Sequence, residues 1–303
     1  MTGGEALLAR YARRVNEALA EALRMPDAPC ADARVPARLA EAMRYSLLAD
    51  GKRVRPALLL AAVDMLGGDE AEAMPLACAL EMLHAYSLIH DDLPGMDDDD
   101  LRRGRPTNHV VYGVGMALLA GDGLLNLAHE HMLDNALRYP QHLACHLAAI
   151  AEISRRAGVT GMIAGQCMDM LSEGTTGEAD LLGYIHRHKT ADLLTAPLTA
   201  AGCLCGVSDQ AQRALESFGQ CVGLAFQITD DILDVEGDAA ALGKQTGVDA
   251  QRGKLTWPAL HGMAAAKAEA ESLRTRAHAA LAPFAGRAGD LLAIADALTG
   301  RTH

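Results

Sequence analysis

The chain has 303 residues, half of them hydrophobic, which suffices to bury a large core in a single domain over 1–303. Its formal net charge of −12 argues against nucleic acid and anionic membranes as partners, because both would repel it. Only 3% of the residues are aromatic, so Ala, Leu and Met must fill the core, and these residues favour an all-α fold.

Apolar runs separated by helix-breaking residues predict the helices, and no alternating pattern typical of a strand accompanies them. In chain order the predicted helices cover residues 4–25, 36–49, 56–66, 74–93, 109–135, 140–157, 159–172, 178–205, 208–236, 254–281 and 288–299. Pro197 in the run 178–205 predicts a kink just after Lys189 and Thr190, or the end of the helix there.

The seven cysteines are an odd number without a CxxC pair, and most lie in apolar runs. Such residues are typical of reduced core thiols, which predicts a cytoplasmic protein. The first residues contain an early Glu5 and no uninterrupted apolar core, so we expect neither a signal peptide nor a membrane span.

The first acidic cluster follows the apolar run Leu76–His90, which is apolar nearly all round and indicates a buried helix. Asp91 and Asp92 end this run, and Asp97 follows five residues after Asp92. Unpaired carboxylates are costly to bury, so a cation must accompany them.

The second acidic cluster shares one helical face with two uncharged residues. Gly223, Gln227, Asp230, Asp231 and Asp234 recur at i, i+4, i+7, i+8 and i+11. Carboxylates without a thiolate or histidine box are hard oxygen ligands, which suit Mg²⁺ better than zinc or copper. Because Mg²⁺ prefers to bridge carboxylates to phosphates, both clusters predict a phosphorylated ligand. The alternative is a pair of solvated acidic helix ends; a calcium loop is weaker, since the EF-hand pattern is absent.

Basic groups accompany both clusters, and each alone is typical of a solvated surface charge. They are Lys52, Arg53 and Arg55 of the segment GKRVRP, Arg102, Arg103 and Arg105 after the first cluster, Lys189 in the run 178–205, and Lys244 and Lys254 after the second. Beside two magnesium-binding clusters, these cations could hold phosphate oxygens directly, and arginine forks suit that geometry.

His84 lies seven residues before Asp91, two helical turns away on the same face. A single histidine on a buried helix is usually a satisfied core residue, but this position favours a pocket role equally. His90 has no comparable support, and we expect it to be structural.

The two aspartate motifs, GKRxRP, RRGRPT, the Lys189-Thr190 pair and the GK...GK loop, taken in this order, resemble the trans-polyprenyl diphosphate synthase family. Within that family the chain is most similar to bacterial farnesyl diphosphate synthases. The resemblance runs from about Lys52 to Pro258, and the combination is specific although each motif alone is not.

The resemblance implies a helical bundle of the isoprenoid synthase type around a central cavity, and a homodimer. It implies that isopentenyl diphosphate is joined head-to-tail to dimethylallyl and geranyl diphosphate, giving (2E,6E)-farnesyl diphosphate. An allylic diphosphate ionises, the double bond of isopentenyl diphosphate attacks the carbocation, and a proton is lost. The released pyrophosphate is the implied proton acceptor, so no general base is expected.

Site residues follow from the resemblance motif by motif. Three Mg²⁺ ions would bridge the allylic diphosphate to Asp91, Asp97 and Asp230, with Asp92, Asp231 and Asp234 as ligands through water or as supports. The implied ligands of isopentenyl diphosphate are Gly51, Lys52, Arg55, His84 and Arg103. Those of the allylic diphosphate are Arg102, Lys189, Thr190, Gln227, Lys244 and Lys254. Catalytic dipoles facing the carbocation would come from Lys189, through its carbonyl, and from Thr190 and Gln227.

Product length depends on residues just before the first cluster. Tyr86 and Ser87 lie five and four residues before Asp91, about 6 to 8 Å along a helix. The bacterial farnesyl synthases that this chain resembles have an aromatic residue five positions before the first aspartate. They also have the two-residue insertion that gives the spacing DDx4D, and the resemblance therefore implies a C15 product. Helical geometry is less decisive, because Ser87 shares the face of Asp91 and Tyr86 is rotated to one side.

Four other functions are weighed against this one. A geranylgeranyl diphosphate synthase would keep the chemistry and lengthen the product. A terpene cyclase would carry an Asn/Ser/Glu pattern where this chain has DDILD. A non-catalytic subunit would have lost an acidic motif or the pair Lys52 and Arg55. A metal-binding structural helical bundle would explain the carboxylates and leave the basic motifs without a role.

Overall fold

The computed structural model describes residues 3–23, 35–172, 174, 179–236, 254–284 and 286–300. Its regular structure is almost entirely helical, which confirms the all-α prediction. The chain divides into two compact units. We call Leu8–Leu60 with Glu70–Leu143 the N-terminal unit, and Met1–Leu7, Ala61–Asp69 and Ala144–His303 the C-terminal unit.

Most elements belong to one unit, while α1 (Gly3–Ala22) and α3 (Val54–Leu66) contribute to both. The N-terminal unit contains α2 (Ala37–Leu47), α4 (Glu70–Asp91), β1 (Leu101–Arg102), β2 (Arg105–Pro106), α5 (Asn108–Tyr112), α6 (Val114–Arg138) and a 3₁₀ turn (Pro140–His142). The C-terminal unit contains α7 (Leu143–Ala157), α8 (Met162–Ser172), α9 (Ala179–Ile185), a π-helix (His186–Ala191), α10 (Asp192–Leu204), α11 (Asp209–Glu236), α14 (Trp257–His261), α15 (Met263–Ala280), a 3₁₀ turn (Ala282–Phe284) and α16 (Gly289–Thr299).

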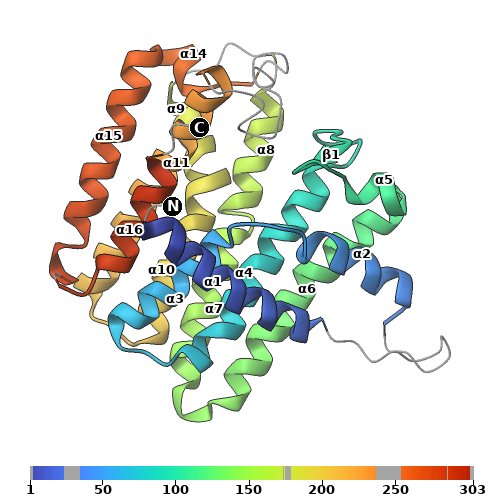
Figure 1. Ribbon diagram of the computed structural model, residues 1–303, viewed down its shortest axis with the longest axis horizontal. Coiled ribbons are helices and arrows are strands. Elements are labelled where there is room, and N and C mark those ends of the chain that lie inside the picture. Colours follow the sequence, from blue (N-terminus) through green and yellow to red (C-terminus); the bar gives the residue numbers. More distant parts are fainter. Residues whose placement is uncertain are drawn as a thin grey trace. The chain divides into compact units, whose positions relative to one another are not determined.

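Helix α4 is the buried centre of the N-terminal unit and packs along α6 (Figure 1). Its Leu76, Leu80 and Leu83 have no exposed surface, as expected for a helix that is apolar nearly all round. His90 contacts α6: its Nε2 lies 3.1 Å from the Leu118 carbonyl oxygen. It therefore has the structural role expected from the sequence.

Glycines divide two helices that the sequence predicts as continuous. Gly113 separates α5 from α6 with φ +88°, and Gly262 separates α14 from α15 with φ +85°. Both values lie in the left-handed region, which glycine adopts without steric cost and which an α-helix cannot contain. The predictions over 109–135 and 254–281 were therefore wrong about continuity.

A small antiparallel hairpin was not predicted. Strands β1 and β2 pair Leu101 with Pro106 and Arg102 with Arg105. The two residues between them, Arg103 and Gly104, have φ +53° and +75°, as the tight primed turns of hairpins require. The hairpin therefore presents three arginines on a short rigid support.

The predicted helix 178–205 contains an irregularity before its proline. A π-helix over His186–Ala191 joins α9 to α10, and the N–H of Asp192 bonds to the Arg187 carbonyl five residues earlier. Pro197 lies inside α10, which continues to Leu204. The interruption predicted near Lys189 is thus an extra helical residue and not a helix end.

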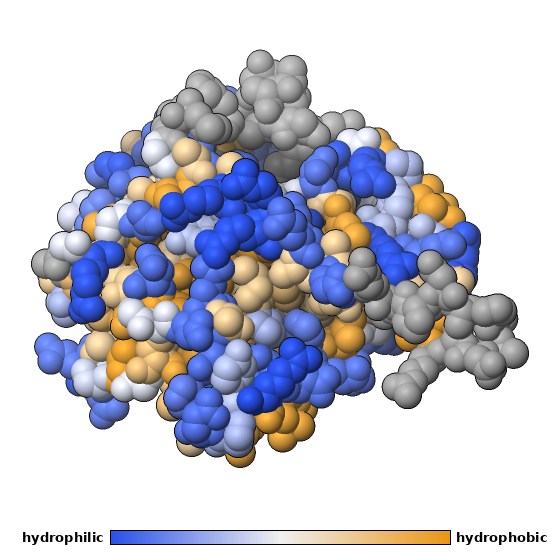
Figure 2. All heavy atoms as spheres, turned by 60° about the horizontal axis from the view of Figure 1, so that its bottom comes forward, coloured by the Kyte–Doolittle hydropathy of each residue, from blue (hydrophilic) through white to orange (hydrophobic). Residues whose placement is uncertain are grey.

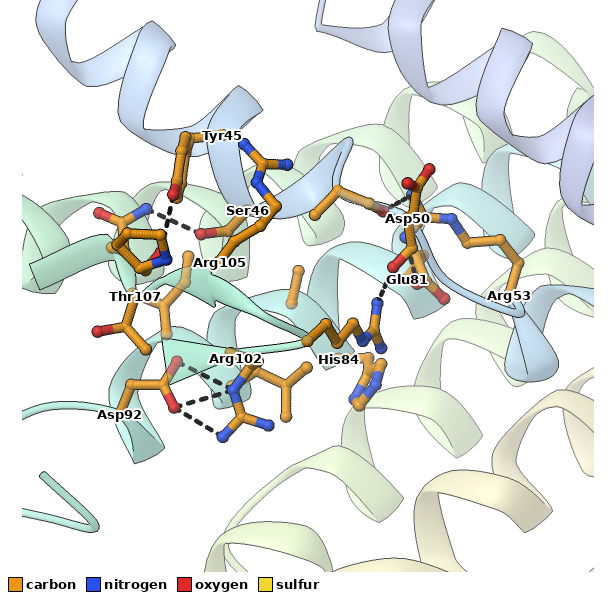
Figure 3. Close-up of a pocket in the computed structure, with 17 residues that line it drawn as sticks. Tyr45, Ser46, Asp50, Arg53, Glu81, His84, Asp92, Arg102, Arg105 and Thr107 are labelled. Atoms are coloured by element: carbon orange, nitrogen blue, oxygen red, sulfur yellow. Dashed lines mark hydrogen bonds and ion pairs between the residues drawn. The ribbon is translucent and has the colours of Figure 1, made fainter. Parts of the chain in front are cut away.

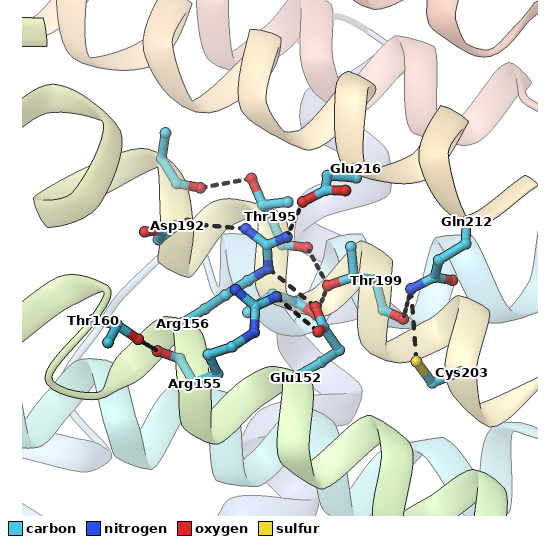
Figure 4. Close-up of polar contacts among 12 residues, drawn as sticks. Glu152, Arg155, Arg156, Thr160, Asp192, Thr195, Thr199, Cys203, Gln212 and Glu216 are labelled. Atoms are coloured by element: carbon cyan, nitrogen blue, oxygen red, sulfur yellow. Dashed lines mark hydrogen bonds and ion pairs between the residues drawn. The ribbon is translucent and has the colours of Figure 1, made fainter. Parts of the chain in front are cut away.

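The π-helix is fixed on one side by a buried polar network (Figure 4). Arg156 of α7 donates hydrogen bonds to Glu152, Asp192 and Glu216. The bond to Asp192 joins Nη1 and Oδ1 at 2.9 Å. Asp192 Oδ2 in turn lies 2.7 Å from His188 Nδ1. The network therefore ties the π-helix to α7 and α11.

Glycines bring two further helices against the π-helix. A Cβ added at Gly165 of α8 would overlap the Lys189 backbone nitrogen. A Cβ added at Gly223 of α11 would lie 2.5 Å from the Ala191 Cα. Because only glycine permits these approaches, the backbone of Lys189 and Thr190 is held between α8 and α11.

Hydrophobic side chains reach the surface among hydrophilic ones (Figure 2). On α5 and α6 and the residues between them, the exposed apolar set consists of Val110, Val111, Val114, Leu118, Leu119, Leu133 and Leu137. Across the described ranges, no helix combines the length and apolar character that crossing a membrane requires.

Candidate active site

The first aspartate motif ends α4 in a closed loop. The Asp97 N–H donates to the Asp91 carbonyl oxygen at 2.8 Å, and the Met96 N–H to the Leu93 carbonyl oxygen at 2.8 Å. The inserted Pro94 and Gly95 form the exposed tip of this loop. The DDx4D spacing therefore brings the backbone of Asp97 next to that of Asp91, and both residues are half-buried.

Asp92 has a different environment, because Arg102 of β1 binds it with two nitrogens. Arg102 Nε lies 2.9 Å from Asp92 Oδ1 and Nη2 lies 2.6 Å from the same oxygen. Asp92 is only 3% exposed, and burial raises the pKa of its carboxyl group although Arg102 lowers it. Asp92 thus holds the hairpin arginine in place.

A cavity of the N-terminal unit lies beside this pair (Figure 3). Its wall includes His84 and Glu81 of α4 and Arg102, Arg103 and Arg105 of the hairpin. Apolar side chains of α4, including Leu88 and Ile89, complete it. Four arginines, including Arg53, outnumber the three carboxylates of the lining, Asp50, Glu81 and Asp92, so the cavity suits an anionic ligand.

Arginines surround His84. Burial is the main reason that the pKa of His84 lies well below its usual value, and the positive charges of Arg55, Arg103, Arg102 and Arg53 lower it further. The imidazole is therefore neutral at physiological pH and offers a hydrogen-bond donor and an acceptor without adding charge.

Arg53 is a site residue whose role the sequence did not reveal. It is 4% exposed and donates to Glu81 Oε1 at 2.7 Å, to Asn16 Oδ1 at 2.8 Å and to the carbonyl oxygens of Leu47 and Ala49. Its φ of +48° is unusual for a side-chain-bearing residue. Because Lys52 and Arg55 of the same segment carry the same charge, no sequence signal marked Arg53 as a structural anchor.

Gly51 acts through Arg103. A Cβ at Gly51 would lie 2.5 Å from Arg103 Nη1, which itself donates to the Asp50 carbonyl oxygen at 2.5 Å. Arg55 is half-buried, and burial lowers its pKa to about 10. Its Nε is enclosed and meets no hydrogen-bond acceptor among the described residues, while Lys52 is exposed. Arg55 and Arg103 are therefore close enough to act on the charge of His84, and Gly51 leaves room for the Arg103 side chain.

The second aspartate motif anchors a chain of hydrogen bonds in the C-terminal unit. The Thr190 hydroxyl donates to Gln227 Oε1 at 2.6 Å, and Gln227 Nε2 donates to Asp231 Oδ1 at 2.9 Å. Asp231 also accepts from the Trp257 N–H at 2.8 Å and lies 3.3 Å from His186 Nε2. Asp231 therefore orients the two predicted dipoles.

The remaining residues of this motif lie on the same helix. Asp230 is half-buried and Asp234 is buried. Lys189 and Lys254 both approach Asp169 of α8. The sequence analysis did not select Asp169, whose only signal was a single carboxylate within an apolar helix. Lys244 lies outside the described residues.

The two predicted length-determining residues differ in size and setting. Tyr86 is buried, and its ring meets the His90 ring edge-on at 5.8 Å. Burial, followed by the charge of Asp91, raises the pKa of Tyr86 to about 12. Ser87 donates to the His84 carbonyl oxygen at 2.9 Å, so its short side chain turns back on α4.

The donors of both motifs are hard carboxylate oxygens, which fit Mg²⁺. Within the ranges that the structure describes, no three His, Cys, Asp or Glu side chains already converge as a metal cage. Mg²⁺ does not need one, since it commonly combines one or two carboxylates with water and phosphate oxygens.

Three comparisons agree on the family. A family profile for polyprenyl synthetase matches residues 36–281. A geranylgeranyl pyrophosphate synthase 9 of Arabidopsis thaliana is 47% identical over 272 residues, covering 88% of this chain and 75% of the relative. A farnesyl diphosphate synthase of Geobacillus stearothermophilus is 50% identical over 233 residues, covering 77% and 78%.

A solved structure resembles the whole chain. The apo crystal structure of an FPP/GFPP synthase from Zymomonas mobilis superposes with a TM-score of 0.85 at 32% identity, covering 98% of each chain. With the fold, both aspartate motifs and the arginine-lined cavity already in place, the chain therefore belongs to the polyprenyl synthetase family of prenyltransferases.

Proposed function

We propose that the chain is a Mg²⁺-dependent farnesyl diphosphate synthase of the single-domain, isoprenoid-synthase type. It joins isopentenyl diphosphate to dimethylallyl diphosphate and then to geranyl diphosphate, and it releases a C15 product. Farnesyl and geranylgeranyl synthases both stand among its similar relatives, so the product length rests on the chain's own residues.

Tyr86 is the observation that carries the C15 assignment. Its ring is buried one and a half helical turns before Asp91, and the edge-on contact with His90 limits its movement. A rigid ring close to the diphosphate end of the site leaves room for a short hydrocarbon tail. Ser87 is too small to close the space in its place.

Isopentenyl diphosphate is bound at the cationic side of the cavity in the N-terminal unit and by the segment GKRVRP, whose Arg53 lines that cavity. Arg55 and Arg103 provide paired N–H donors for diphosphate oxygens, and the neutral His84 adds a hydrogen bond. Lys52 contributes a further charge from the exposed end of this segment. Gly51 adds its backbone to this site, and Arg53 anchors the segment through Glu81.

The allylic diphosphate is bound by Arg102, Lys189, Lys244 and Lys254 together with the aspartate motifs. Asp91, Asp97 and Asp230 would hold three Mg²⁺ ions, with support from Asp92, Asp231 and Asp234. The bound metal would supply the positive charge that stabilises a departing pyrophosphate. The carboxylates need this metal, because they would otherwise repel the substrate.

The carbocation is stabilised by neutral dipoles. Gln227 Oε1 accepts from Thr190, and Asp231 fixes the Gln227 amide from its other end. The Thr190 hydroxyl oxygen, Gln227 Oε1 and the Lys189 carbonyl oxygen direct negative partial charge to the reacting carbon. None of them forms a covalent bond with it. The released pyrophosphate removes the proton.

The assembly is a cytoplasmic homodimer. The exposed apolar set of α5 and α6 supports the homodimer, because apolar side chains that share one surface region mark protein–protein contacts. Size-exclusion chromatography with light scattering tests it: Leu137→Lys should shift the mass toward that of a monomer, whereas an unchanged dimer would place the interface elsewhere.

Product analysis tests the function. The purified protein is incubated with Mg²⁺, isopentenyl diphosphate and either dimethylallyl or geranyl diphosphate, and the products are identified by mass spectrometry. A dominant C15 diphosphate is expected. Tyr86→Ala should lengthen the product, while Ser87→Ala serves as the matched control and should not.

A geranylgeranyl diphosphate synthase is the second candidate. The 47% identity to the Arabidopsis enzyme favours it. A C20 product from the native protein, with no further lengthening by Tyr86→Ala, would establish this alternative and remove Tyr86 as the limit.

A further inference from the structure

Asp169 of α8 joins two lysines that are distant in the sequence. It is 7% exposed and accepts a hydrogen bond from Lys189 Nζ at 2.5 Å. Lys254 Nζ lies 3.9 Å from the same oxygen, Oδ2. One buried carboxylate oxygen therefore faces two ammonium groups, and neither aspartate motif includes it.

The backbone fixes Asp169 in this position. Gly165, one turn earlier on α8, lies so close to the Lys189 backbone that any side chain there would overlap it. Helix α8 runs beside the π-helix that carries Lys189 (Figure 1). Ser172 donates to the Asp169 carbonyl oxygen at 2.8 Å and closes the last turn of α8. The carboxylate is thus held close to Lys189 by backbone packing.

The charge arrangement favours a further anion. Two ammonium groups that converge without a counter-charge repel each other, and Asp169 offsets one of their two charges. The three side chains together keep a net positive charge.

We propose that Asp169 is a positioning residue for the allylic substrate: it holds Lys189 and Lys254 as a pair before the diphosphate binds. The proposal rests on the proposed function, in which both lysines bind the allylic diphosphate. Asp169 itself does not touch the substrate. Asp169 lowers the free-energy cost of substrate binding, because the two lysine side chains are already ordered next to each other.

Asp169→Asn tests the proposal, since it keeps the shape and removes the charge. Steady-state kinetics with geranyl diphosphate should show kcat/KM for this substrate reduced by about 10- to 100-fold, the usual range for a charged hydrogen bond. The KM for isopentenyl diphosphate should stay unchanged, because other residues bind it. Asp180→Asn changes an exposed acid on α9 and is the matched control.

A double variant separates positioning from a general structural role. If Asp169 acts through Lys189, then Asp169→Asn with Lys189→Gln should lose little more than Lys189→Gln alone. Losses that multiply would overturn the proposal. Calorimetric titration with magnesium pyrophosphate should show the same coupling without any turnover.

The outcomes also distinguish this inference from the proposed function. A Lys189→Gln variant with a normal allylic KM would remove Lys189 from the substrate site and overturn both. A raised allylic KM in Lys189→Gln, with a normal one in Asp169→Asn, would overturn the role of Asp169 alone. If Asp169→Asn does not fold, Asp169→Glu is used instead, because it keeps the charge. The proposal would be contradicted if Asp169→Glu raised the KM for the allylic substrate as far as Lys189→Gln does.

Discussion

The N–H of Asp97 donates to the carbonyl oxygen of Asp91 at 2.8 Å, so two aspartates six positions apart share one turn of backbone. Asp92, between them in sequence, is instead bound by Arg102. Neighbouring carboxylates of one motif therefore have different surroundings: Asp92 is bound by the hairpin arginine, whereas Asp91 and Asp97 are joined through their backbone.

Replacement of these neighbours should separate activity from stability. Asp91→Ala should reduce turnover by about a thousandfold or more, because a magnesium ligand is lost, while the free energy of unfolding changes little. Asp92→Ala should lower the free energy of unfolding by about 2 kcal/mol, since Arg102 loses a charged acceptor. Product assays and urea denaturation measure the two effects. Equal loss of stability in both variants would contradict the division.

Arg53 should contribute far more to stability than an exposed arginine. Arg53→Met leaves Glu81 buried without its partner, which should cost about 3 to 5 kcal/mol in the free energy of unfolding. Arg14 pairs with Glu70 on the surface, so Arg14→Met is the matched control and should cost less than about 1 kcal/mol. Urea denaturation of both variants provides the comparison, and similar midpoints would argue against an anchoring role for Arg53.

The glycine contact at the π-helix should not tolerate a methyl group. Gly165→Ala places a Cβ against the Lys189 backbone, which should cost about 3 kcal/mol and lower activity further by moving Lys189. Gly183 on α9 has open space around it, so Gly183→Ala should stabilise the protein by about 0.5 to 1 kcal/mol. Thermal denaturation tests both, and a harmless Gly165→Ala would show that α8 can move away.

His84 should make stability depend on pH. Its pKa in the folded protein lies well below that in the unfolded chain, so the unfolded chain binds a proton near pH 6.5 that the folded protein does not. The free energy of unfolding should therefore fall as the pH decreases from about 6.5, by about 1.4 kcal/mol per pH unit, until folded His84 is protonated. His84→Gln should remove this part of the slope. Parallel curves for both proteins between about pH 6.5 and 5 would exclude it.

The sequence predicted what depends on residues close together in the chain. The apolar run before Asp91 indicated a buried helix, and the i, i+4, i+7 spacing from Gly223 placed Gln227 and Asp230 on one face. The same approach could not find the helix breaks at Gly113 and Gly262, because glycine only permits a left-handed φ and does not require it.

Long-range contacts were beyond sequence reasoning. Arg53 lay among arginines and lysines that resembled it, and only the fold brings Glu81 to it. Asp169 is separated from Lys254 by more than two helices, so no spacing rule connects them. Residues that orient a site, unlike those that bind, carry no motif of their own.

The π-helix has a consequence for insertions and deletions. Its additional residue rotates α9 by about 100° relative to α10. Within this segment, Lys189 reaches α8 and Thr190 reaches α11. Deleting one residue from His186–Ala191 would restore an uninterrupted α-helix and turn one of these side chains away from its partner. The length of this segment therefore fixes which neighbours Lys189 and Thr190 contact.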